Sequence, residues 1–135
     1  MAGVIRVRAE ILDCMVQEAR RDPQEECCGL LGGRAAVITA IFPARNSLAS
    51  PTAFEIAPEE LFQIFRQMRA ARLQHLGIYH SHPAGENSPS PRDIARAFYP
   101  DVTYLIVSPL PGLQQPVRAF SIRDSRVWEL TVEPV

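Results

Sequence analysis

The sequence lacks a strong charge of either sign, and it lacks any long hydrophobic run. Its 135 residues carry a formal net charge of −1, so no broad positive field would attract nucleic acid or an anionic membrane. The most apolar stretch, residues 102–110, contains Pro109 and is far too short to cross a bilayer. We therefore expect neither a nucleic-acid partner nor a membrane partner.

Cysteines are few, and the N-terminal residues show no secretory signal. The chain has three cysteines, of which Cys27 and Cys28 are adjacent, and an odd, adjacent set is a poor disulfide framework. Arg6 and Arg8 interrupt the N-terminal stretch before an apolar segment of secretory length can form. Both features favour a reducing compartment, and we predict a cytoplasmic location.

Length and composition predict one domain with mixed secondary structure. A chain of 135 residues that is 47% hydrophobic and 21% charged has ordinary globular composition and closes around one core. We expect residues 1–135 to form a single domain. Helical and strand patterns alternate along the chain. This alternation favours an α/β fold, a mixed β-sheet sandwiched by helices in two or three layers, rather than a bundle or a barrel.

Local patterns predict three helices. Apolar residues recur at helical spacing over residues 11–19. A second helix begins at Pro58, and its apolar stripe includes Phe62, which we expect in the core. Ser90 suits the cap of a third helix, with Pro91 in its first turn.

Apolar runs bounded by turn residues predict the strands. A run that ends at Gly32 and Gly33 precedes another apolar run, which is typical of a hairpin. The segment between this hairpin and the second helix is rich in Pro, Asn and Ser, which indicates a loop. The predicted strands cover residues 27–31, 35–42, 53–56, 76–79, 102–107, 117–122 and 127–132.

Two histidines and an aspartate form a candidate metal site. His80 and His82 lie two residues apart at the end of a predicted strand, and alternate residues of a strand face the same side. Catalytic zinc commonly takes three nitrogen or carboxylate ligands and leaves a fourth position open. Asp93 would supply the third ligand, because Gly85 and the prolines after His82 let the chain turn back.

Hydrolysis at such a site also needs a carboxylate that moves protons. Glu25 and Glu26 immediately precede the first predicted strand. Adjacent residues of a strand face opposite sides, so at most one of them faces the metal. The residues alone do not choose between the two.

These positions resemble the JAMM motif of the MPN, or JAB, metallopeptidases. That motif is an upstream glutamate, then His-x-His, seven residues, a serine, two residues and an aspartate. Glu26, the segment His80-Ser-His-Pro, Ser90 and Asp93 match it without a gap. The similarity extends to Ser50-Pro-Thr-Ala-Phe-Glu-Ile and covers most of residues 23–94.

The resemblance implies a fold, a metal and a role for each motif residue. The fold would be that of the JAB/MPN domains, which is cytidine-deaminase-like, and the protein would be a JAMM-type zinc metallopeptidase or isopeptidase. By resemblance, Zn²⁺ is bound by His80, His82 and Asp93. Glu26 acts as general base and then general acid, and Ser90 stabilises the oxyanion.

Purely structural roles remain open for the same residues. Ser90 also suits a helix cap alone, Asp93 a first-turn acid, and Glu26 a solvated charge at a strand edge. A zinc deaminase is disfavoured, because its signature needs a downstream C-x-x-C and the chain has none.

The remaining histidine and the paired cysteines have simpler structural interpretations. We expect His75 to have a surface or packing role. Cys27 and Cys28 are expected to pack as small apolar residues, with metal ligation or nucleophilic catalysis as the alternatives. None of the three is needed for the proposed site.

The resemblance also implies a substrate class. Enzymes of this family cleave after the C-terminal glycines of ubiquitin-like proteins, and some small stand-alone bacterial members release cysteine or a peptide from a sulfur carrier with a Gly-Gly tail. We therefore predict a hydrolase that cleaves peptide or isopeptide bonds after the Gly-Gly tail of a ubiquitin-like or sulfur-carrier protein, with the tail lying against a strand edge. The alternative is a non-catalytic MPN-type scaffold or protein-binding module.

Overall fold

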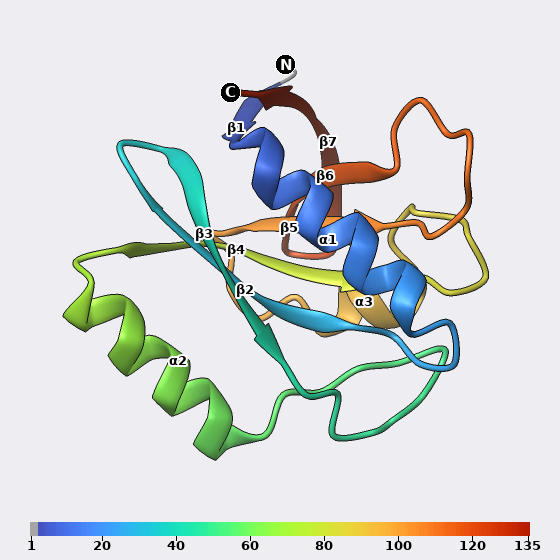
Figure 1. Cartoon of the computed structure of the whole chain (residues 1–135), viewed down its shortest axis with the longest axis horizontal. Coiled ribbons are helices and arrows are strands. Elements are labelled where there is room, and N and C mark those ends of the chain that lie inside the picture. Colours follow the sequence, from blue (N-terminus) through green and yellow to red (C-terminus); the bar gives the residue numbers. More distant parts are fainter. Residues whose placement is uncertain (1–2) are drawn as a thin grey trace.

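A computed structural model describes residues 3–135 and shows helices that pack against one mixed sheet (Figure 1). None of the helices in this part of the chain is long and apolar enough to cross a membrane. In chain order, the elements are β1 (Val4–Val7), α1 (Ala9–Arg21), β2 (Cys28–Arg34), β3 (Val37–Ala44), α2 (Pro58–Ala70), β4 (Gln74–Ser81), α3 (Pro91–Ala95), β5 (Thr103–Val107), β6 (Val117–Arg123) and β7 (Arg126–Pro134).

The strands form one sheet in the order β1-β3-β2-β4-β5-β6-β7. The β4–β5 pair is parallel, whereas β2 pairs antiparallel with both β3 and β4. The expectation of a mixed sheet with flanking helices is therefore confirmed. The expectation against a barrel was wrong, because β1 pairs in parallel with both β3 and β7 and closes the sheet on itself.

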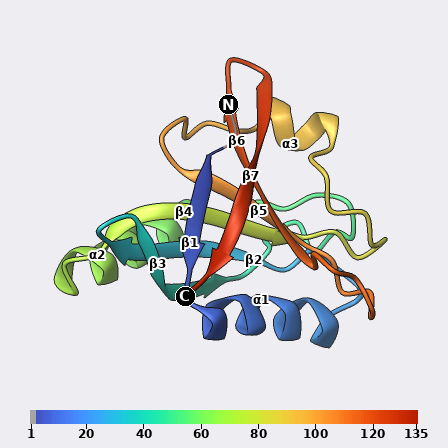
Figure 2. The ribbon, with the colours of Figure 1, turned by 90° about the horizontal axis from the view of Figure 1, so that it is seen from above.

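The central strands send alternate residues into two separate apolar clusters. On β2, Leu31 belongs to the cluster that contains the buried face of α1, and Leu30 belongs to the cluster that contains the buried face of α2. On β4, Tyr79 and Ile78 divide in the same way, as the two-residue period of a strand requires. Figure 2 shows α1 along one side of the sheet and α3 beyond the opposite side.

The turn of the first hairpin lies later than predicted. Gly32 and Gly33 are within β2, at an irregular register, and the strand continues to Arg34. Ala35 and Ala36 make the turn with φ values of 52° and 61°, which is the backbone that a two-residue hairpin with the twist of its strands needs. Because alanine is not a residue typical of turns, the sequence pattern placed the turn at the glycines, and that prediction was wrong.

Two further predictions near α2 were wrong. Residues 53–56 belong to no strand. The backbone N–H and carbonyl of Glu55 bond to Asn46 and Ser47 instead of to a neighbouring strand. Phe62 is 63% exposed. The core face of α2 is centred on Ile64, and Phe62 points away from that face.

Candidate metal centre

Two of the predicted ligands lie at the C-terminal end of β4: His80 is within the strand, and His82 is just beyond it. His80 lies between Cys28 of β2 and Ile106 of β5 in the register, and its side chain is buried. His82 follows β4, and its backbone N–H donates to the carbonyl of Val107 at 3.0 Å. This bond continues the extended run, so both imidazoles face the same side of the sheet.

Asp93 of α3 completes a cluster with the two imidazoles. Its Oδ1 lies 3.2 Å from Nε2 of His80, and its Oδ2 lies 3.0 Å from Nε2 of His82. The two Nε2 atoms are 3.1 Å apart. Ligands that surround a metal ion tetrahedrally at ~2.0–2.1 Å lie roughly 3.3 Å from one another, so the donor set fits one ion at its centre. The structure thus brings together the three residues that the sequence analysis singled out as ligands.

Neighbouring groups hold the cluster in a ligand-ready state. The Nδ1–H of His82 donates to the carbonyl of Glu86 at 2.6 Å, which leaves the lone pair on Nε2, facing the other donors. The backbone N–H of Ser90 donates to Oδ2 of Asp93 at 2.9 Å, and the N–H of Asp93 donates to Oγ of Ser90 at 3.1 Å. This reciprocal capping box fixes the carboxylate at the start of α3. The ring of Phe54 stacks on His80 at 4.6 Å.

The electrostatics of the cluster favour a cation. Burial opposes ionisation of Asp93, but hydrogen bonds to His80 and His82 outweigh it and lower its pKa. Burial lowers the pKa of His80 and so favours its neutral, ligating form. For His82, burial is outweighed by the hydrogen bonds to Asp93 and Glu86, and its pKa is raised. A carboxylate and two imidazole Nε2 atoms thus converge at one buried point, where a metal ion would take the place of the protons that these groups share.

Glu26 is a buried carboxylate beside this cluster. Its side chain is 3% exposed, and its Oε1 has no hydrogen-bond partner within residues 3–135. Its pKa is raised to about 7, mainly by burial and also by the charge of Asp93, against the opposing effects of His82 and Arg92. Glu25, in contrast, is only partly buried. Of the two glutamates that the sequence left open, the structure buries Glu26.

Asn46 was not predicted, yet it holds the neighbourhood of Glu26 together. It is 3% exposed, and its Nδ2 donates to the carbonyls of Glu26, Ser50 and Ala53 at 3.1, 3.4 and 2.9 Å. Its Oδ1 accepts from the backbone N–H of Leu48 and of Glu55 at 3.1 and 3.2 Å. A lone asparagine in a polar loop gives no sequence signal for such a role.

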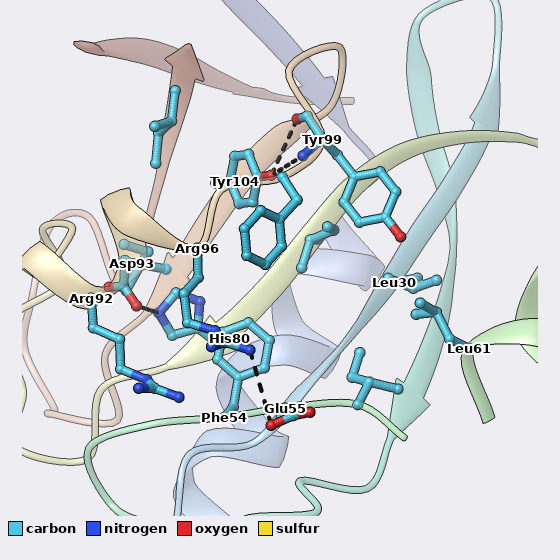
Figure 3. A pocket seen from close by; sticks show the side chains of 15 residues that line it. Leu30, Phe54, Glu55, Leu61, His80, Arg92, Asp93, Arg96, Tyr99 and Tyr104 are labelled. Atoms are coloured by element: carbon cyan, nitrogen blue, oxygen red, sulfur yellow. Dashed lines mark hydrogen bonds and ion pairs between the residues drawn. The ribbon is translucent and has the colours of Figure 1, made fainter. Parts of the chain in front are cut away.

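A cavity of about 230 Å³ opens beside the cluster, lined by His80, Asp93 and mostly apolar side chains. Figure 3 shows Arg92 of α3 and Arg96, just after α3, reaching toward the segment that carries Phe54 and Glu55. The cavity therefore connects the candidate metal centre with a largely apolar surface between α3 and residues 54–61.

The other singled-out residues have packing roles. His75 packs edge-on against Phe65 and Tyr99, as expected of a structural histidine. Cys27 and Cys28 are free thiols and are buried. Burial raises the pKa of Cys27 to about 12, which disfavours a nucleophilic thiolate.

A sheet of this form that carries a His-His-Asp cluster is the arrangement of a JAMM-type hydrolase. The chain belongs to the Prok-JAB family, the prokaryotic homologs of the JAB domain, whose model matches residues 8–124. It is 35% identical to the CysO-cysteine peptidase of Mycobacterium tuberculosis over 134 residues, which is 98% of this chain and 90% of that protein. It is 38% identical to the desampylase of Haloferax volcanii over 112 residues, which is 78% of this chain and 81% of that protein.

Solved structures support the same fold. Protein DSY2949 from Desulfitobacterium hafniense superimposes with a TM-score of 0.86 at 32% identity, covering 98% of this chain and 92% of that one. A structure described as a metalloprotease-like JAMM zinc site in the proteasome and signalosome superimposes with a TM-score of 0.62 at 18% identity, covering 96% and 98%. The second similarity concerns the fold alone.

Proposed function

We propose that this protein is a zinc-dependent hydrolase that cleaves the bond after the Gly-Gly tail of a ubiquitin-like or sulfur-carrier protein. The convergence of His80, His82 and Asp93 beside the buried Glu26 carries this proposal. The names of the relatives support the substrate class, because they describe a CysO-cysteine peptidase, desampylases and a probable protease of TtuB-protein conjugates. The free cysteines agree with a cytoplasmic location.

Zinc suits this donor set, which consists of two imidazole nitrogens and a carboxylate. His80, His82 and Asp93 would hold the ion. When bound, zinc supplies Lewis acidity, which polarises a carbonyl group and makes water more acidic.

Glu26 would take a proton from the attacking water and then give it to the leaving nitrogen. A proton shuttle works best when its pKa lies near the working pH, and in the metal-free protein burial brings the pKa of Glu26 to about 7. The unpartnered Oε1 is free to make this hydrogen bond. Glu26 is thus the proposed general base and general acid.

Ser90 would stabilise the negative charge that develops on the carbonyl oxygen. Its Oγ accepts the backbone N–H of Asp93, and a hydroxyl that accepts one hydrogen bond still has its own proton to donate. Capping and oxyanion stabilisation are therefore compatible in the same side chain.

The tail itself would lie along residues 53–57. Within residues 3–135 the sheet closes on itself, so the predicted addition of the tail to a strand edge has no free strand to use. The segment 53–57 belongs to no helix or strand, however, and the backbone groups of Phe54 and Ile56 make no hydrogen bonds within the described chain. Both side chains line the cavity. A glycine tail could pair with these backbone groups in the manner of an added strand.

Intact mass spectrometry tests this function. The substrate is a ubiquitin-like carrier whose Gly-Gly tail is extended by one residue, and the enzymes are the zinc-loaded wild type, Glu26→Gln and the matched control Glu25→Gln. The wild type and Glu25→Gln should release the added residue, whereas Glu26→Gln should not. Equal cleavage by Glu26→Gln would remove Glu26 from the mechanism, and no cleavage of any Gly-Gly-tailed carrier would refute the function.

A further inference from the structure

We propose that Arg92 recognises the free α-carboxylate of the leaving residue, so that the preferred substrate is a carrier joined to the α-amine of a single amino acid rather than to a lysine side chain of a protein. This inference rests on the proposed function and specifies its leaving group. It assigns to Arg92 a role in specificity that the motif does not contain.

The two arginines of the cavity differ in their partners. Arg92 is in α3, Arg96 is the residue that caps the C-terminal end of α3, and both line the cavity beside His80. Arg96 forms an ion pair with Glu55 at 4.0 Å and lies over the ring of Phe98 at 5.6 Å. The side chain of Arg92 has neither an ion pair nor a hydrogen bond within residues 3–135. Arg92 therefore offers an uncommitted guanidinium at the edge of the candidate metal centre.

The charges at the site leave one positive charge unmatched. A divalent ion would be balanced by the carboxylates of Asp93 and Glu26, and Glu55 balances Arg96. Arg92 has no such counterpart. Its field reaches the reacting region, because its charge lowers the pKa of Glu26. A substrate that brings one negative charge next to the scissile bond would complete the balance, and guanidinium binds a carboxylate in a two-point geometry.

Reach distinguishes the two kinds of leaving group. Hydrolysis adds water across the C–N bond: the carbonyl carbon takes the hydroxyl group, and the leaving nitrogen takes the proton. In a single amino acid, the carboxylate carbon lies two bonds from that nitrogen, while in a lysine side chain the backbone carbonyl lies six bonds away and is usually amidated. Arg92 directly precedes the ligand Asp93, and adjacent Cα atoms are about 3.8 Å apart. Because Arg92 lines the same cavity as His80 and Asp93, we place the carboxylate that lies two bonds from the reacting nitrogen against its guanidinium.

Binding of two matched peptides tests the inference independently of turnover. The probes are acetyl-Gly-Gly-Ala with a free carboxylate and the same peptide with a terminal carboxamide. They are titrated by calorimetry at low salt into zinc-loaded Glu26→Gln protein, whose zinc content is checked first. The acid should bind about tenfold more tightly than the amide, as expected for one charge-assisted pair.

Variants of the two arginines assign the preference. Adding Arg92→Gln should bring the acid-to-amide ratio close to one, Arg92→Lys should restore part of it, and the matched control Arg96→Gln should leave it at about tenfold. A preference that survives in Arg92→Gln would mean that the metal alone binds the carboxylate, and the inference would be wrong. Equal binding of both peptides, or binding of neither, would also overturn it.

The outcome separates the two proposals. If the acid binds selectively through Arg92 but wild-type enzyme cleaves no Gly-Gly-tailed substrate, the proposed function fails and the carboxylate site stands. If wild-type enzyme cleaves the acid and amide forms of the peptide at equal kcat/KM, the function stands and the role of Arg92 fails.

Discussion

Replacing Glu26 by glutamine should stabilise the metal-free protein, and the gain should grow with pH. Burial raises the pKa of Glu26 from its ordinary value of 4.5 to about 7 in the folded state. Below pH 4.5 the carboxyl is protonated in both states, so ionisation contributes nothing to stability. Between 4.5 and 7 the unfolded chain ionises first, and the folded wild type loses stability as the pH rises.

The size of the effect follows from the same two pKa values. The gap between 4.5 and about 7 corresponds to about 3 kcal/mol of destabilisation that is complete above pH 7. Glutamine has nearly the same shape as glutamate and does not ionise. Ionisation at position 26 therefore should not make the stability of the Glu26→Gln protein depend on pH. We therefore expect the free energy of unfolding of Glu26→Gln to exceed that of the wild type by up to ~3 kcal/mol at pH 8, and by much less at pH 5.

Urea unfolding measures this difference. Both proteins are stripped of metal with a chelator and unfolded at several pH values between 5 and 8.5, with Glu25→Gln as a control. Glu25 is partly exposed, so its variant should track the wild type at every pH. If the free energies of unfolding of Glu26→Gln and the wild type differ by the same amount at every pH in this range, the pKa of Glu26 is not raised by folding, and the reasoning is refuted.

Three further changes test the surroundings of the site. Ser90→Ala should lower turnover by roughly 10²–10³-fold and the free energy of unfolding by about 1 kcal/mol. Metal analysis should find that the variant retains its zinc, and a folded variant without zinc would contradict the assigned role. Asn46→Ala removes five hydrogen bonds and should reduce stability by about 3 kcal/mol, which urea unfolding would detect; an unchanged midpoint would argue against its structural role. Gly29→Ala would place a Cβ 2.5 Å from the carbonyl oxygen of Phe42 and 2.6 Å from the ring of Tyr79, so a loss of about 2–3 kcal/mol is expected, and wild-type stability would show that the sheet can relax here.

The candidate ligands could be predicted from sequence because short-range rules govern them. Residues two apart on a strand face the same side, so the side chains of His80 and His82 could be expected to lie next to each other. Ser90, Pro91 and Asp93 follow the rules for a helix start, and the structure shows the complete capping box. Only the distance from the histidines to Asp93 depended on the resemblance, because no local rule specifies how a loop returns.

The features that were missed depend on long-range contacts. The closure of the sheet by β1 depends on its pairing with β3 and β7, and no periodicity in a strand names its partner. The role of Asn46 depends on five backbone groups that a folded loop brings to one point. The exposure of Phe62 follows from the way α2 is rotated on the sheet. Residue types alone do not encode such arrangements.

Zinc stoichiometry combined with X-ray absorption spectroscopy tests the central claim most directly. Reconstituted wild-type protein should hold one zinc per chain, with nitrogen and oxygen ligands at about 2.0–2.1 Å. Asp93→Ala should lose that ion, and the control His75→Ala should keep it. A protein that binds no zinc after reconstitution, or one whose zinc has sulfur ligands at about 2.3 Å, would contradict a centre built from His80, His82 and Asp93.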